Sequence, residues 1–162
     1  MNFNIGQELT LNDVFIRLLM SAILGMVIGI NREINNKAAG LKTHCLVIIG
    51  ATVIAIIERF YIFEVVTLNN PTVAISVGRF TVGVITGIGF LGAGTISLKE
   101  NSTPEGLTTA ASIWCTACLG LAVGMGYYWI AIIALIFIMI ILTLVSKIIF
   151  LIKNKWFSYI LL

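Results

Sequence analysis

Charge is the scarcest property of this sequence. Only 10% of its 162 residues are charged, whereas 59% are hydrophobic, and the charged share is less than half that of an ordinary soluble domain. With a mean hydropathy of +1.08, the chain would expose far too much apolar surface to water. The lack of charge therefore excludes a soluble globular protein and predicts a single-domain integral membrane protein.

Other function classes are excluded by what is missing. The net charge of +3 includes no dense basic run, so nothing favours nucleic-acid binding. A single histidine cannot form a histidine-based metal cluster, and of the seven acidic residues only Glu33 and Glu58 fall near membrane depth. Magnesium prefers octahedral oxygen ligands, so these two are weak candidates for a magnesium site. Without a G-x-x-x-x-G-K-[ST] loop or a catalytic constellation, we predict no enzyme and no bound cofactor, leaving magnesium as the one candidate ligand.

Long apolar runs are what the sequence has in quantity. Crossing the hydrocarbon takes about 20 residues of helix, and five segments meet or approach that length, at about 14–31, 44–63, 79–98, 104–125 and 128–150. Residues 151–162 form a basic and aromatic tail that is expected to lie along the interface. The predicted fold class is all-α, a polytopic membrane bundle of five transmembrane helices.

Local signals refine these boundaries. Arg17 lies near the start of the first segment and is expected to snorkel to the interface. Ser102 and Glu105 have the spacing of a capping box, and Pro104 suits a first helical turn, so a helix should begin there. The uncharged run that follows is about twice one span, and the "GMGYYW" stretch is the best place for its break.

The basic residues predict an orientation. Seven of them, in the segments after the first and third spans and at the C-terminal end, would lie on one side, against Arg17, Arg59 and Arg79 on the other. By the positive-inside rule the N-terminus is outside and the C-terminus is cytoplasmic. Cys45, Cys115 and Cys118 lie in apolar runs and are expected to pack as small hydrophobic residues.

The stretch "GIGFLGAG", Gly87 to Gly94, contains the G-x-G-x-x-G spacing of a dinucleotide-binding loop. Such a loop needs a preceding strand and an acidic residue about 20 positions later, whereas this stretch lies inside an uncharged apolar run. The same glycines suit close helix packing or a local break that faces a cavity. We favour close packing.

Small residues four apart occur in three segments, 14–31, 79–98 and 104–125, which are therefore expected to form the tight centre of the bundle and to support a homodimer. Three hydroxyl side chains in 104–125 share one stripe and could cross-link helices or line a path. The candidates for helix packing or cavity lining are Gly25, Gly29, Gly83, Gly87, Gly89, Gly92, Gly94, Thr108, Ser112, Thr116, Gly120 and Gly124.

Four ordered blocks resemble the membrane domain of the MgtC/SapB family: "GINRE", "AGLKTH", "GIGFLGAGTI" after Arg79, and "GLTTAASIW". The resemblance implies a multi-pass protein of the bacterial inner membrane, associated with magnesium limitation and, in pathogens, with survival inside host cells. It also implies action by docking on membrane partners such as the ATP synthase. Longer members carry a cytosolic C-terminal ACT-like domain where this chain ends in a short tail, and many place an aspartate before the arginine that matches Arg79, where this chain has none.

The polar residues of these blocks are the candidates for a partner-docking patch or a gate: Arg32, Glu33, Gly40, Lys42, Thr43, His44 and Arg79. Arg32 and Glu33 could equally be an interfacial anchor, and His44 could be a plain interfacial residue or sense pH near neutrality. Glu58, Arg59 and Arg79 are expected to neutralise one another, or to form an external vestibule. The favoured function is regulation of ion homeostasis by docking; the alternative is a small ion or solute transporter with a path along segments 79–98 and 104–125.

Overall fold

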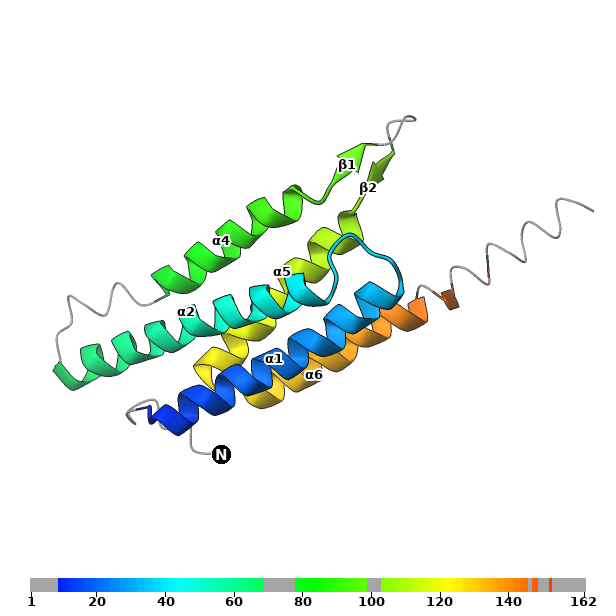
Figure 1. The fold of residues 1–162 in the computed structure, drawn as a ribbon. Coiled ribbons are helices and arrows are strands. Elements are labelled where there is room, and N and C mark those ends of the chain that lie inside the picture. Colours follow the sequence, from blue (N-terminus) through cyan, green and yellow to red (C-terminus); the bar gives the residue numbers. More distant parts are fainter. Residues whose placement is uncertain (1–8, 69–77, 99–102, 146, 149–151, 153–162) are drawn as a thin grey trace, which may run out of the picture.

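Five α-helices form a bundle in the part of the chain that the structure describes, residues 9–68, 78–98, 103–145, 147–148 and 152 of a computed structural model (Figure 1). The all-α membrane bundle that the sequence predicts is confirmed. The helices are α1 (Leu11–Ile34), α2 (Leu41–Leu68), α4 (Arg79–Ala93), α5 (Leu107–Met125) and α6 (Tyr128–Ile140), and a π-helical turn, Ile141–Val145, continues α6.

Four of these helical segments are long and apolar enough to cross a membrane: Leu11–Ile34, Leu41–Val65, Leu107–Met125 and Tyr128–Val145. Helix α4 is shorter, because its 15 residues rise about 22 Å, less than the ~30 Å thickness of the hydrocarbon core. The third span was predicted to continue to residue 98, but the helix ends at Ala93. The amide of Thr95 bonds to the carbonyl of Gly92 at 3.0 Å, which tightens the last turn.

A short hairpin occupies the place where the fourth helix was predicted to begin. Strand β1 (Ser97–Leu98) pairs antiparallel with β2 (Pro104–Glu105), with Ser97 opposite Glu105. Helix α5 starts only after Gly106, whose φ of +89° turns the chain and whose close approach to Thr95 leaves no space for a Cβ atom. The predicted helix start at 104 is therefore wrong, and Ser102 of the supposed capping box lies outside the described residues.

The break between α5 and α6 falls where the sequence predicts it, within "GMGYYW". Gly126 has a φ of +94°. Its amide donates to the carbonyl of Val123 at 2.9 Å, and the amide of Tyr127 donates to the carbonyl of Ala122 at 2.8 Å. This pair of hydrogen bonds is the Schellman arrangement that ends many helices at glycine.

Helix α2 packs against both α1 and α5, with α4 on one side of the bundle and α6, which contacts α5 and α1, on the other (Figure 1). A Cβ atom on Gly29 of α1 would lie 2.7 Å from the Cα of Leu41, and one on Gly120 of α5 would lie 2.5 Å from the carbonyl oxygen of Ile48. The glycines of α1 and α5 therefore receive the backbone of α2, and the prediction that the third glycine-bearing helix completes this centre is wrong.

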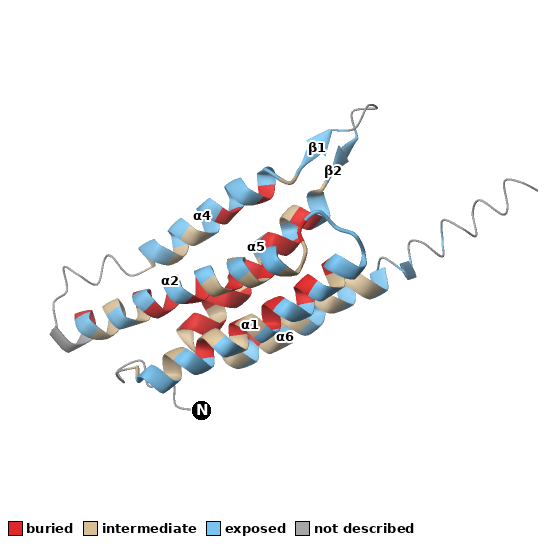
Figure 2. Ribbon diagram, in the orientation of Figure 1, coloured by how far each residue is buried: buried red, intermediate tan, exposed pale blue. Residues whose placement is uncertain are grey.

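Burial follows the same arrangement, since buried residues concentrate on α5 and on the facing sides of α1 and α2 (Figure 2). Ile28, Ile48, Ala55 and Val123 have no exposed surface. Many large hydrophobic side chains point outward, among them Phe90, which is 82% exposed. Such a surface suits lipid, not water.

Candidate functional site

Polar side chains gather inside the bundle, and each of the buried ones has a described hydrogen bond to another helix or to a backbone carbonyl of its own helix. Those that are buried are Arg17, Ser21, Arg32, His44, Thr52, Glu58, Thr109, Ser112 and Thr116. Unpaired polar groups are costly in lipid, so their contacts indicate which helices the chain must hold together.

We call Arg32, His44, Thr109 and Ser112 the Arg32 cluster. Arg32, in the last turn of α1, is 3% exposed and donates from Nη2 to the hydroxyl of Thr109 at 2.7 Å, while its Nε has no hydrogen-bond partner among the described residues. The guanidinium thus ties α1 to the start of α5. Of the two interpretations that the sequence left open for Arg32, a surface anchor does not fit this burial.

His44, the only histidine, is fully buried between α2 and α5. Its Nδ1 lies 2.8 Å from the carbonyl oxygen of Gly40, and because a carbonyl only accepts, Nδ1 carries a proton. Its Nε2 lies 3.3 Å from the hydroxyl of Ser112, which also lies 2.8 Å from the carbonyl of Thr109. A serine hydroxyl has one proton, so it serves one of these acceptors at a time.

Glu33 and Gly40 meet at the start of α2. The carboxylate Oε2 of Glu33 accepts from the amide of Leu41 at 2.8 Å, which satisfies one of the free amides of the first turn. A Cβ atom on Gly40 would lie 1.8 Å from the same oxygen, so glycine leaves room for this contact. Lys42 and Thr43 follow on the exposed side of the helix.

Two arginines bind the other end of α5. Arg17 of α1 donates to the carbonyl of Gly124, and its guanidinium lies 5.8 Å from the centre of the Tyr128 ring. Arg59 of α2 donates to the carbonyl of Met125 at 2.8 Å. Cations at the carbonyl end of a helix also complement its dipole. Arg17 is only 5% exposed, so the expectation that it snorkels outward is wrong: the free carbonyls of α5 hold it inside.

Midway along the bundle, Ser21 and Thr52 join α1, α2 and α5. Their hydroxyl oxygens lie 2.6 Å apart, and that of Thr52 is 3.0 Å from the carbonyl of Gly120. Sequence reasoning missed both residues. The available signal was the position of Ser21 one turn after Arg17, since i and i+4 share a helix face.

Glu58 on α2 is 1% exposed and accepts a hydrogen bond from the hydroxyl of Thr81 on α4. Its second oxygen, Oε1, has no hydrogen-bond partner within the described ranges. Arg79, at the start of α4, is exposed. Among the described contacts, Glu58 thus accepts from Thr81 and Arg59 donates to the carbonyl of Met125, whereas the sequence suggested that Glu58, Arg59 and Arg79 neutralise one another.

The buried hydroxyl stripe of α5 shares Ser112 and Thr116 with the predicted one and differs from it at a single position. Thr108 is exposed, whereas Thr109, Ser112 and Thr116 are buried. The hydroxyl of Thr116 donates to the carbonyl of Ser112 at 2.7 Å. Spacings of three and four alternate along a buried helix face, and the predicted stripe used spacings of four alone.

The two weak magnesium candidates are far apart. Glu33 contacts Leu41 at the first turn of α2, and Glu58 lies about 25 Å further along that helix at 1.5 Å per residue. The described residues contain no group of three or more His, Cys, Asp or Glu that could hold a metal ion. Cys45, Cys115 and Cys118 are free and partly buried.

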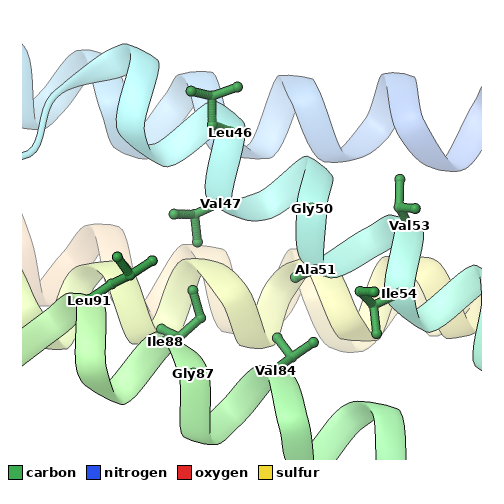
Figure 3. A pocket seen from close by; sticks show the side chains of 10 residues that line it. All are labelled: Leu46, Val47, Gly50, Ala51, Val53, Ile54, Val84, Gly87, Ile88 and Leu91. Atoms are coloured by element: carbon green, nitrogen blue, oxygen red, sulfur yellow. The ribbon is translucent and has the colours of Figure 1, made fainter.

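Helix α4 is attached at both ends and leaves a groove between. Near its start the Phe80 ring meets Tyr61 of α2 edge-on, with centroids 6.3 Å apart, and near its end a Cβ atom added to Gly92 would lie 3.5 Å from Ala110 of α5. Between these two contacts, α2 and α4 form an open groove of about 650 Å³. It is lined by apolar side chains and by Gly50 and Gly87 (Figure 3). We call it the α2–α4 groove.

The glycines of the "GIGFLGAG" stretch are helical up to Ala93, with Gly94 as the cap, so the stretch has no strand-to-helix bend for a dinucleotide. Cβ atoms on Gly83, Gly87 and Gly89 would meet nothing within 4 Å, whereas those on Gly25, Gly29, Gly120 and Gly124 would meet α2 at 2.5 to 2.7 Å. The bundle therefore has two kinds of glycine. Those of α1 and α5 are covered by α2, whereas Gly83, Gly87 and Gly89 of α4 have open space beside them.

Comparison with known proteins identifies a matching family and several similar proteins. The model of the MgtC family matches residues 18–149. The chain is 36% identical over 143 residues to YhiD of Escherichia coli K12, whose name describes a candidate magnesium transporter, covering 88% of this chain and 65% of YhiD. It is 38% identical over 130 residues to SapB of Bacillus subtilis 168, covering 79% of this chain and 54% of SapB.

Protein MgtC of Salmonella typhimurium 14028s is 38% identical over 124 residues, covering 76% of this chain and 48% of that protein. The chain thus spans about half to two thirds of the length of these relatives. No solved structure gives a significant match.

Proposed function

Because the chain belongs to the MgtC family, we propose that it works in the bacterial inner membrane as a regulator of ion homeostasis under magnesium limitation. It acts by docking on other membrane proteins, with the ATP synthase as the first candidate partner, and needs neither a catalytic step nor a resident cofactor. A homodimer is its expected assembly. A role in survival inside host cells stays a prediction.

The open glycines of α4 are the observation that supports docking. Gly83 and Gly89 are exposed, and added Cβ atoms would meet nothing there, although each glycine weakens a helix by about 1 kcal/mol relative to alanine. Glycines let another helix backbone approach closely in a membrane. In α1 and α5 the glycines already serve this purpose within the chain, so those of α4 are available to a second protein.

The buried polar groups support the same conclusion. Arg32, His44 and Thr52 hold α1, α2 and α5 to one another, and the α2–α4 groove has only apolar walls. A hydrated path for ions needs polar groups that face water. Most of the buried polar side chains that are described instead contact neighbouring helices, while Nε of Arg32 and Oε1 of Glu58 have no hydrogen-bond partner among the described residues.

The test is retention of a membrane partner after mild extraction, compared between the unmodified protein and Gly83→Leu. We expect Gly83→Leu to lose the ATP synthase or another specific partner while keeping its own melting temperature, because the new side chain enters open space. Thr108→Leu is the matched control, because Thr108 is also exposed but lies on α5 and not on α4. This variant should retain the partner. Equal retention by all three proteins would contradict docking through α4.

Transport is the second candidate, because the name of the relative YhiD refers to magnesium transport. A path for magnesium, another small cation or a solute would run along α4 and α5, with Arg79 and the Arg32/Glu33 pair as gates. Purified protein in liposomes decides between the two. We expect no magnesium flux above that of empty liposomes; flux that disappears in Arg79→Ala would establish transport instead.

A further inference from the structure

The α2–α4 groove has a shape that calls for an apolar occupant. It extends about 12 Å along α2 from Leu46 to Ile54 at 1.5 Å per residue, and its α4 side runs from Leu91 to Val84 (Figure 3). A bound water needs two to four polar partners, and the lining side chains offer none. In a membrane the groove is therefore filled by hydrocarbon or by a side chain of another helix.

A lysine lies on α2 one turn before Leu46, the first residue that lines this groove. Lys42, Leu46 and Gly50 are four residues apart on α2, so they share one face of the helix, and all three are exposed. Lys42 has no hydrogen bond or ion pair within the described parts of the chain. The neighbouring hydroxyl of Thr43 is exposed as well.

The opposite end is closed. One turn beyond Ile54, Glu58 accepts a hydrogen bond from Thr81, and Tyr61 meets Phe80. These two contacts bridge α2 and α4, so a long occupant cannot continue past them along the groove. The groove is thus apolar along its length, open at a lysine and shut at its far end.

We propose that the α2–α4 groove binds one acyl chain of an anionic phospholipid, with the phosphate headgroup at Lys42. A flexible acyl chain that ends inside the bundle fits a groove with one closed end, whereas a helix about 10 Å across continues in both directions. Lys42, which has no ion pair among the described residues, selects a negative headgroup at the end where the acyl chain enters. This proposal is independent of docking through Gly83 and concerns a lipid ligand of the fold itself.

Native mass spectrometry of the full chain tests it. The protein is exposed to equal amounts of phosphatidylglycerol and phosphatidylethanolamine with the same acyl chains, and the bound fraction of each is measured. We expect a preference for phosphatidylglycerol. Gly50→Leu should reduce the binding of both lipids about tenfold, because the new side chain displaces at least two methylene groups from the groove. Lys42→Gln should reduce only the preference for phosphatidylglycerol, by about fivefold.

Two matched variants control for side effects. Gly89→Leu adds the same side chain to an equally open glycine of α4 that does not line the groove, and Lys37→Gln removes an exposed lysine of the α1–α2 loop. Both should bind lipid as the unmodified protein does. Lys42→Gln changes an exposed residue and tests the proposal without altering the groove, should Gly50→Leu fail to fold.

Two results would overturn the proposal: Gly50→Leu that binds lipid normally, or Lys37→Gln that lowers headgroup preference as much as Lys42→Gln. If Gly50→Leu binds lipid normally and also converts dimer to monomer, the groove belongs to a second copy of the chain. Loss of a protein partner in Gly83→Leu would bear on the docking function alone.

Discussion

At the scale of single residues, buried guanidinium groups are tolerated in this bundle because helix ends and hydroxyls provide oxygen acceptors. The last carbonyls of α5 have no partner within their own helix, and Arg17 and Arg59 donate to two of them, on Gly124 and Met125. At the other end of the same helix, Arg32 donates to Thr109. Each of these arginines thus holds α5 to another helix.

Replacement of Arg17 measures how much such a contact contributes. Arg17→Met removes a charged donor to a buried carbonyl and should lower the free energy of unfolding by about 1.5–3 kcal/mol. Arg17→Lys, which can still donate, should recover part of the loss. Unfolding in detergent measures both, with Lys37→Met at an exposed loop position as the control. If Arg17→Met is no less stable than Lys37→Met, Arg17 snorkels after all.

The hydroxyls of α5 offer a second test at this scale. Ser112→Ala leaves Nε2 of the buried His44 without a described partner, and an unsatisfied buried group costs about 1–3 kcal/mol. Thr108→Ala, at an exposed position on the same helix, should change stability by less than about 0.5 kcal/mol. Melting temperatures in one detergent compare the two. Equal effects would restore the stripe through Thr108 that the sequence suggested.

At the scale of elements, the helices pack through glycines whose roles differ. A Cβ atom on Gly120 would meet the backbone of α2 at 2.5 Å, whereas one on Gly83 would meet nothing. We therefore expect Gly120→Ala to destabilise the protein by about 1–3 kcal/mol through overpacking. Gly83→Ala should be neutral or stabilise it by up to about 1 kcal/mol, because alanine favours the helix. Denaturant titration in mixed micelles separates them, and a stable Gly120→Ala would mean that α5 does not pack on α2 in this way.

The elements also mark the limit of what the sequence could predict. Long apolar runs with few charges are enough to predict helices of membrane length, and the two glycines around Met125 mark the break between α5 and α6. The start of α5 was not predictable from a local pattern, because it depends on the pairing of Ser97 with Glu105 across a hairpin. The burial of Arg17 depends on where α5 ends in space, which spacing along α1 does not reveal.

At the scale of the whole molecule, α2 connects the core of the bundle to its outer surface, because it packs on α1 and α5 and also lines the groove with α4. Its backbone fills the glycine faces of α1 and α5, and its outer side forms the α2–α4 groove. The helices that it joins carry the buried polar contacts, whereas α4 and its open glycines remain at the periphery. Docking and lipid binding are therefore proposed for surfaces that the core does not use.

The orientation of the bundle is a prediction from the basic residues of its loops and can be tested directly. Arg32, Lys37 and Lys42 lie at or beside the α1–α2 connection, so the positive-inside rule places that loop in the cytoplasm and the start of α1 outside. In a background with Cys45, Cys115 and Cys118 replaced by alanine, Asn12→Cys should react with a membrane-impermeant maleimide in intact spheroplasts. Asn36→Cys should react only after the membrane is opened, since both asparagines are exposed and are predicted to lie on opposite sides of the membrane. The reverse pattern would invert the protein and place the headgroup at Lys42 in the outer leaflet.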